Sequence, residues 1–220
     1  MRSYDEIFAI AAERKGGAKA LEAMLVEAKP EVAPTNLPED RWLSAMTRGV
    51  FQAGFSWKVI ESKWPGFETA FKSFDVDACA MMDDTWLDQL LKDEGIVRNG
   101  AKIQSVRDNA VFIQGLRAEG GISDLFGNWP ATDFVGLLAR MKDDGARLGG
   151  TTGQYLLRTL GCDSFVLSKD VVGRLIAEGV VDKAPTSKKA MAAVQQAFNT
   201  WSEQSGHSLT RISRTLALSL

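Results

Sequence analysis

The sequence predicts an all-α protein, for three reasons. Apolar residues recur at helical spacing in almost every stretch; between Asp133 and Asp144 they stand at Phe134, Leu137, Leu138 and Met141. No stretch shows the sustained alternation of β-branched residues that is typical of strands, and Phe165 to Leu167 is too short to establish a sheet. Pro, Gly, Asp and Asn recur where helices start or stop, so we expect an array of about ten helices.

The N-terminal part predicts two helices. Ser3 to Glu6 combines an N-cap residue with early acidic residues, and the pair Gly16-Gly17 interrupts the helix that they open. Ala18 to Lys29 forms the second helix, which Pro30 ends.

The middle of the chain predicts a series of shorter helices. A Pro-rich connection, Glu31 to Pro38, leads into a helix that starts at Pro38-Glu39-Asp40 and runs into the apolar stretch Phe51 to Ile60. Pro65 stands early in the next helix. Further turn or cap signals stand at Asp75, Asp83, Asp84 and Asn99.

The composition excludes several classes of protein. Of the 220 residues, 45% are hydrophobic and 25% are charged, which excludes disorder as the main state. No apolar run approaches the roughly 20 residues that cross a bilayer, and the N-terminal residues lack the apolar core of a signal peptide. We therefore expect a cytoplasmic protein in which Cys79 and Cys162, which form no close pair, are buried free thiols.

Charge is distributed unevenly along the chain. The net charge is −2, but nine basic and five acidic residues follow from Gly145 onward, so this part carries +4 and the rest −6. A basic C-terminal part is expected of a protein that meets phosphate on one face, and the alternative is ordinary solvated charge. Arg98 and Lys102 stand one helical turn apart and either contact phosphate or are solvated. The densest basic cluster is Lys183, Lys188 and Lys189.

Three short stretches carry most of the functional information. The stretch Phe51-Gln52-Ala53-Gly54-Phe55-Ser56-Trp57-Lys58-Val59-Ile60 puts a Gln, a Gly and a Trp inside an apolar segment that is expected to be helical. Ile96-Val97-Arg98-Asn99-Gly100-Ala101-Lys102-Ile103 and Arg147-Leu148-Gly149-Gly150-Thr151-Thr152 follow it. In this order they resemble the signature motifs of the 3-methyladenine DNA glycosylase I family, over roughly residues 40–162.

The resemblance implies a fold and a domain organisation. DNA glycosylases of the helix-hairpin-helix superfamily consist of two helical lobes with the base pocket between them. We therefore expect residues 1–220 to form a single glycosylase-like unit. One lobe would span residues 40–162, and residues 1–39 and 163–220 would form the other.

The third motif predicts a DNA-binding hairpin over residues 145–154. Glycines let the backbone approach a phosphate closely, and the N–H groups at the start of the second helix, Gln154 to Leu160, donate to anions. Related enzymes that cut the DNA strand carry a nucleophilic Lys just after these glycines, where this chain has Gln154, so no lyase activity is expected. The residues expected to contact DNA are Gly149, Gly150, Thr151, Thr152 and Gly153.

Gln52 and Trp57 are the expected base pocket. The flat face of Trp57 suits a methylated, electron-poor purine and stabilises its positive charge, while the Gln52 amide both donates and accepts hydrogen bonds. A five-residue offset does not place the two side chains on one helical stripe, so their shared pocket rests on the resemblance. The alternative for Trp57 is packing in the core.

The sequence departs from the family pattern at two places. The family has a pocket Glu three residues before the signature Gln, where this chain has Gly49. The family also has zinc-binding His and Cys near its termini, whereas this chain has one His, His207, and no Cys near either end. A zinc site of that kind cannot be assembled, and we expect neither a metal nor a cofactor.

Asp170 is the candidate catalytic residue. In the wider superfamily a catalytic Asp follows the hairpin beside a short apolar run, and Phe165 to Val172 stands in that place here. A carboxylate at this position stabilises the positive charge that develops on the sugar as the base leaves, or activates a water. The alternative is an N-cap for a helix from Val171 to Glu178. The neighbouring Lys169 is expected to contact phosphate.

These features predict a monofunctional DNA glycosylase of base excision repair. It would flip an alkylated purine such as 3-methyladenine out of the helix and hydrolyse its N-glycosidic bond. The expected partner is double-stranded DNA with an alkylated base. We expect a monomer in the cytoplasm, held at the bacterial nucleoid through DNA and without membrane contact. The alternative is a non-catalytic protein that binds DNA lesions or DNA structures.

Overall fold

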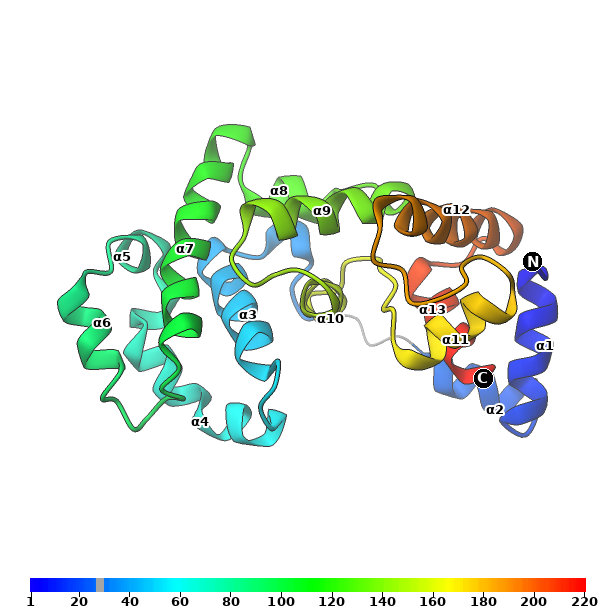
Figure 1. The fold of residues 1–220 in the computed structure, drawn as a ribbon, viewed down its shortest axis with the longest axis horizontal. Coiled ribbons are helices and arrows are strands. Elements are labelled where there is room, and N and C mark those ends of the chain that lie inside the picture. Colours follow the sequence, from blue (N-terminus) through cyan, green and yellow to red (C-terminus); the bar gives the residue numbers. More distant parts are fainter. Residues whose placement is uncertain (27–29) are drawn as a thin grey trace. The chain divides into compact units, whose positions relative to one another are not determined.

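A computed structural model describes residues 1–26 and 30–220, and these residues contain helices and no β-strand (Figure 1). The predicted all-α class is therefore confirmed. The α-helices are α1 (Tyr4–Arg14), α2 (Ala18–Leu25), α3 (Glu39–Gln52), α4 (Trp57–Ala70), α5 (Val76–Ala80), α6 (Asp84–Leu90), α7 (Gly100–Leu116), α8 (Ile122–Gly127), α9 (Phe134–Asp144), α10 (Thr151–Thr159), α11 (Lys169–Ala177), α12 (Lys188–Ser205) and α13 (Leu209–Leu218). Short 3₁₀ turns are η1 (Pro34–Asn36), η2 (Lys72–Phe74), η3 (Arg117–Glu119) and η4 (Ala131–Asp133).

The chain divides into two compact units. Unit 1 consists of Met1–Glu31, Pro130–Gly136 and Leu157–Leu220, and unit 2 of Val32–Trp129 and Leu137–Leu156. Helices α9 and α10 each contribute residues to both units. Most of residues 40–162, expected as one lobe, lie in unit 2, whereas residues 130–136 and 157–162 lie in unit 1.

Unit 1 is built around its last helix. α13 packs against α1, α2, α11 and α12 and buries Leu209, Ile212 and Leu216 (Figure 1). On α11, the buried Arg174 donates to Ser219 Oγ at 2.8 Å and pairs with Glu178 at 3.3 Å. Glu178 also accepts two hydrogen bonds from Arg2, so residues near both ends of the chain are joined within this unit.

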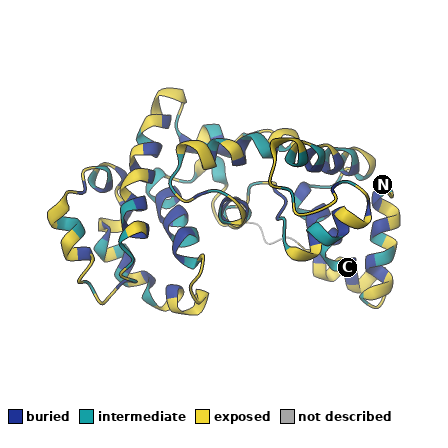
Figure 2. Cartoon of the chain, in the orientation of Figure 1, coloured by how far each residue is buried: buried dark blue, intermediate teal, exposed yellow. Residues whose placement is uncertain are grey.

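Unit 2 is built around α7, which packs against α3, α5, α6 and α8 (Figure 1). Figure 2 shows buried residues along the length of both α3 and α7. Beside them, successive ring centroids of an aromatic cluster lie 4.7 to 6.2 Å apart, a spacing at which aromatic pairs attract each other. The cluster consists of Phe51, Trp64, Phe67, Phe71 and Phe74.

Most helix starts follow the sequence signals. Ser3 and Glu6 form a capping box at α1, and the side chains at the starts of α5, α6 and α7 accept the expected hydrogen bonds from N–H groups of the first turn. These caps are Asp75, Asp83 and Asn99.

Two predicted boundaries need correction. Pro65 lies in the middle of α4 rather than early in a helix, because α4 already starts at Trp57. The second predicted helix, Ala18 to Lys29, is observed as far as Leu25, and its residues 27–29 lie outside the described part of the chain. Among the described helices, none is both long and apolar enough to cross a bilayer.

Candidate nucleic-acid interface

The first motif lies at a break between two helices, not inside one helix as predicted. α3 ends at Gln52, and the chain is extended at Ala53 before α4 starts at Trp57. Gly54 causes the break, because its φ of +80° is a conformation that favours glycine. Residues from Ala53 to Val59 are exposed, so the motif forms a surface loop and the first turn of α4.

Lys102 of the second motif holds this loop in place. It is buried, and its Nζ donates to the carbonyl oxygens of Val50 at 2.8 Å, Phe51 at 3.4 Å and Ala53. The same ammonium lies 4.6 Å from the centre of the Phe55 ring. Val50 and Phe51 lie in the last turn of α3 and Ala53 directly follows it, at a helix end where carbonyls lack intrahelical donors and a cation is favoured. Lys102 of the second motif therefore caps the C-terminal end of α3, which lies in the first motif.

The two predicted roles of Lys102, phosphate contact and solvated charge, are both wrong. α7 starts only at Gly100, so Arg98 lies outside the helix and pairs with Glu94 at 3.9 Å, while Lys102 turns inward. Burial lowers the pKa of Lys102, and the positive charge of Arg147 lowers it further. The hydrogen bonds that the ammonium donates to three carbonyl oxygens replace those that it would make to water.

Exposed aromatic side chains surround the break. Trp57 is 55% exposed, and its ring meets that of Tyr155 edge to face, with centroids 6.1 Å apart. Tyr155 on α10 and Phe55 in the loop are also exposed. Core packing, the alternative for Trp57, is therefore excluded. Tyr155 was not predicted, although it follows the third motif at helical spacing from Thr151.

The third motif forms the predicted turn between two helices, but α10 starts three residues earlier than expected. Thr151, Thr152 and Gly153 therefore make up its first turn, whose N–H groups lack intrahelical acceptors. Gly150 precedes them with a φ of +62°, and a Cβ there would meet nothing within 4 Å, so the space in front of the helix is open. A Cβ at Gly153 would lie 2.5 Å from the carbonyl oxygen of Leu148, which explains the glycine. Such a helix start is suited to binding phosphate.

Two residues fasten this turn to α7. The Nδ2 of Asn109 donates to the Ala146 carbonyl at 3.1 Å, and its Oδ1 accepts from the Ala146 N–H at 2.8 Å. The Nε of Arg147 donates to the carbonyl of Ala101 at 3.2 Å. Asn109 was not predicted, although its helical spacing from the buried Val106 and Ile113 places a polar side chain on the apolar face of α7, which is a signal for such a clamp.

Gly49, where the family resemblance has a carboxylate, faces α10. A Cβ at this position would lie 3.6 Å from Thr152 Cγ2 and 3.8 Å from Leu156 Cβ. A carboxylate instead reaches the motif from α4, where Glu61 Oε1 accepts a hydrogen bond from Gln52 Nε2 at 3.0 Å. Glu61 was not predicted, because only the break between α3 and α4 brings it together with Gln52.

Asp170 and Lys169 belong to unit 1, whereas Gln52, Trp57 and the hairpin glycines belong to unit 2. Both are exposed in the first turn of α11. The predicted N-cap role of Asp170 is wrong, because Ser168 occupies the cap position and its Oγ accepts from the Val171 N–H at 3.3 Å. A carboxylate in the first helical turn is still electrostatically favourable.

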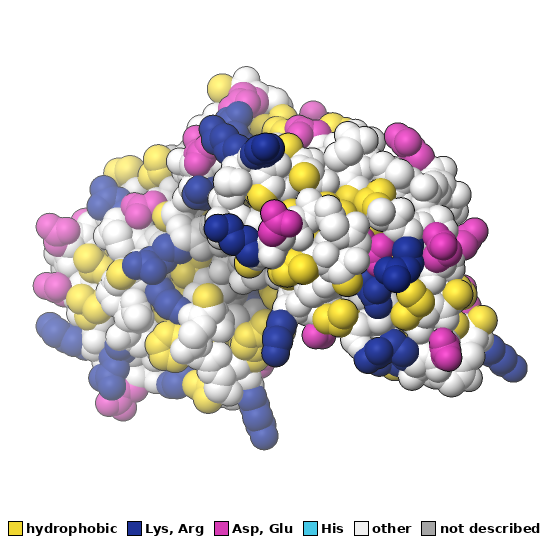
Figure 3. Space-filling view, turned by 45° about the vertical axis from the view of Figure 1, so that its right-hand side comes forward, with side chains coloured by type: hydrophobic (Ala, Val, Ile, Leu, Met, Phe, Trp, Pro, Cys, Tyr) yellow, Lys and Arg dark blue, Asp and Glu magenta, His cyan; other side chains and the backbone are white. Residues whose placement is uncertain are grey.

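Charges of both signs are spread over the face drawn in Figure 3. An anion that approached this face would therefore meet local groups rather than one uniformly basic surface. In unit 2, three exposed cations lie in the motifs, namely Lys58 directly after Trp57, Arg98, which pairs with Glu94, and Arg147 in the hairpin turn.

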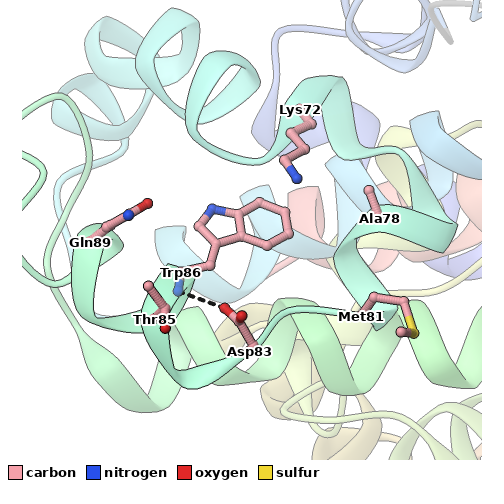
Figure 4. A pocket seen from close by; sticks show the side chains of 7 residues that line it. All are labelled: Lys72, Ala78, Met81, Asp83, Thr85, Trp86 and Gln89. Atoms are coloured by element: carbon pink, nitrogen blue, oxygen red, sulfur yellow. Dashed lines mark hydrogen bonds between the residues drawn. The ribbon is translucent and has the colours of Figure 1, made fainter.

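A separate open cavity of about 400 Å³ lies elsewhere in unit 2 (Figure 4). It is lined by Lys72, Ala78, Met81, Asp83, Thr85, Trp86 and Gln89. The Nζ of Lys72 lies 4.1 Å above the Trp86 ring, so a cation already occupies that ring face. One face of the aromatic ring in this cavity is therefore not free to stack on a base.

The fold matches those of known DNA glycosylases. The crystal structure of a 3-methyladenine DNA glycosylase I superposes with a TM-score of 0.50 at 23% identity, over 60% of this chain and 81% of that one. The Staphylococcus aureus enzyme of that name, in a structure that addresses its 3-methyladenine recognition, gives 0.51 at 19% identity, over 69% of this chain and 89% of that one. This chain therefore has a helical DNA glycosylase fold.

Sequence comparison points to one glycosylase family over part of the chain. Residues 37–135 match the model of the methyladenine glycosylase family. A stretch of 59 residues is 36% identical to DNA-3-methyladenine glycosylase 1 of Escherichia coli (strain K12), which is 27% of this chain and 32% of the relative. The matched stretch thus spans about a third of that relative's length.

Proposed function

We propose that this protein is a monofunctional DNA glycosylase that releases alkylated purines such as 3-methyladenine from double-stranded DNA. The alkylated base leaves the stack, its bond to the sugar C1′ breaks, and water adds to C1′ in its place. The family match and the names of the similar proteins support this proposal. Because methylation at a ring nitrogen makes the base a cationic leaving group, modest catalytic help is enough.

A single feature carries the proposal, namely that α10 combines two functions of a base-flipping surface. Its first turn, Thr151 to Gly153, offers N–H groups to a phosphate. One turn later the exposed Tyr155 meets the exposed Trp57 of the motif loop. A backbone anchor and an aromatic surface for an extruded base therefore lie on the same rigid helix.

The remaining roles concern the cleavage of the N-glycosidic bond. We assign the charge that stabilises the developing sugar cation to Asp170, whose carboxylate is exposed and is not used as a helix cap. Lys169 beside it is assigned to a phosphate. Gln154, at the position of the nucleophilic Lys in related lyases, is buried and carries an amide, so we propose that the protein does not cut the strand.

The proposal is tested by incubating the purified protein with methylated duplex DNA and separating the released bases by chromatography. We expect 3-methyladenine to be released and the abasic strand to break only after alkali treatment. DNA binding without release of any alkylated base would instead support a non-catalytic lesion-binding protein.

The hairpin is tested by Gly150→Asp. A negative charge in the open space before α10 repels phosphate, so we expect affinity for any duplex to fall about tenfold at low salt, equivalent to about 1.4 kcal/mol. The matched control is Gly150→Asn, since Asn has nearly the same shape and also tolerates a positive φ but carries no charge. Fluorescence anisotropy with labelled DNA measures both. Equal affinities for the two variants would refute phosphate binding at this turn.

A further inference from the structure

We infer that Glu61 is a positioning residue that fixes the Gln52 amide with its carbonyl oxygen toward the base, so that the site selects a purine with an amino group at position 6. The inference rests on the proposed function and extends it to specificity. It begins with the hydrogen bond from Gln52 Nε2 to Glu61 Oε1 at 3.0 Å.

The cluster joins α3 to α4 across the motif loop. Arg48 and Gln52 stand one turn apart on α3, and both reach Glu61, with Arg48 NH1 lying 3.4 Å from Glu61 Oε2. The guanidinium of Arg48 also lies 4.3 Å from the centre of the Trp64 ring, a cation–π contact that limits its freedom. Arg48 therefore holds one oxygen of the Glu61 carboxylate, and the other oxygen accepts the hydrogen bond from Gln52.

This arrangement decides which way the Gln52 amide points. A carboxylate only accepts hydrogen bonds, so it binds the NH₂ end of the amide and leaves the carbonyl oxygen of Gln52 facing away from Glu61. The negative charge also polarises the amide and strengthens that oxygen as an acceptor. Gln52 thus offers an acceptor within the motif that carries Trp57.

An acceptor distinguishes the two purines. Adenine carries an amino group at position 6, which donates a hydrogen bond to such an oxygen. Guanine carries a carbonyl there, so two acceptor oxygens would face each other without a donor. A missing or mismatched buried hydrogen bond lowers binding much more than a change in apolar contact does. The cluster therefore favours 3-methyladenine over 7-methylguanine, and it supplies a carboxylate to a motif in which Gly49 has none.

The test uses Glu61→Gln, Gln52→Ala and the double variant. DNA carrying both 3-methyladenine and 7-methylguanine is treated under single-turnover conditions, and the rate of release is measured for each base. Glu61→Gln lets the Gln52 amide adopt both orientations, so we expect the ratio of the two rates to fall about tenfold. In the Gln52→Ala background the same change should leave the ratio unaltered, because Glu61 acts through Gln52.

The controls separate this role from a structural one. Because the cluster is solvent-exposed, Glu61→Gln should barely change stability in urea. Glu94→Gln removes the same charge from a side chain that is 88% exposed in unit 2, and should leave the ratio of rates unchanged. An equal loss for both bases, or an effect of Glu61→Gln that persists without Gln52, would overturn the inference.

Calorimetric titration with free 3-methyladenine and free 7-methylguanine keeps the inference testable if the protein releases no base. Selective binding of 3-methyladenine that Glu61→Gln abolishes would then support the inference while the proposed function fails. Release of 3-methyladenine with a ratio that no variant changes would support the function and overturn the inference. Binding of both bases with equal affinity by the unaltered protein would also overturn it.

Discussion

Lys102→Met is expected to destabilise the protein by about 3 kcal/mol and to slow base release about a hundredfold even where the variant is fully folded. The substitution removes the cation that binds the carbonyls of Val50, Phe51 and Ala53. A methionine of similar length fills the space but leaves these acceptors without a donor at the end of α3. The loop that carries Trp57 then loses its fixed geometry. Urea unfolding and single-turnover base release measure the two effects.

Lys58→Met is the matched control for stability. It makes the same chemical change on an exposed residue of the same unit, so its free energy of unfolding should stay within about 0.5 kcal/mol of that of the unaltered protein. If Lys102→Met unfolded at the same urea concentration as the control, the ammonium would not be the cap of α3.

The fold class and most helix starts were predictable because they depend on local chemistry. Asp75, Asp83 and Asn99 act through hydrogen bonds to N–H groups three residues away, and such contacts are visible in sequence spacing alone. The start of α10 was placed too late because a turn rich in glycine and threonine is typical of a loop. The structure shows that Thr151, Thr152 and Gly153 belong to the first turn of α10, and that Gly153 is required because a Cβ there would meet the Leu148 carbonyl oxygen.

The candidate site was predictable only in part, because its residues act through tertiary contacts. Gln52 and Trp57 were found from the motif, but their neighbours Glu61 and Tyr155 come from different helices and bear no motif of their own. The role of Lys102 was predicted wrongly, because it too depends on a tertiary contact. A Lys one turn from an Arg is usually solvated, and only the end of α3, some 50 positions earlier in the chain, turns it into a buried cap.

Asp170→Asn is expected to lower single-turnover base release at least tenfold, which is about 1.4 kcal/mol of barrier, with DNA affinity close to normal. In the proposed mechanism the carboxylate acts on the charge that develops on the sugar, so its loss should be felt in the transition state and not in the bound complex. Because Ser168 caps α11, Asp170→Asn removes from the helix only a favourable negative charge in its first turn. The free energy of unfolding should therefore fall by about 0.5 kcal/mol.

Two comparison variants make this result decisive. Ser168→Ala should lower stability by about 1 kcal/mol through loss of the cap while base release stays near normal, which separates a disturbed helix from a missing charge. Trp57→Ala should show the reverse of Asp170→Asn, with weaker selective binding to damaged DNA, because a stacking face holds the extruded base. If Asp170→Asn releases base at the unaltered rate, the carboxylate only complements the helix dipole, and the group that stabilises the sugar cation belongs to another residue.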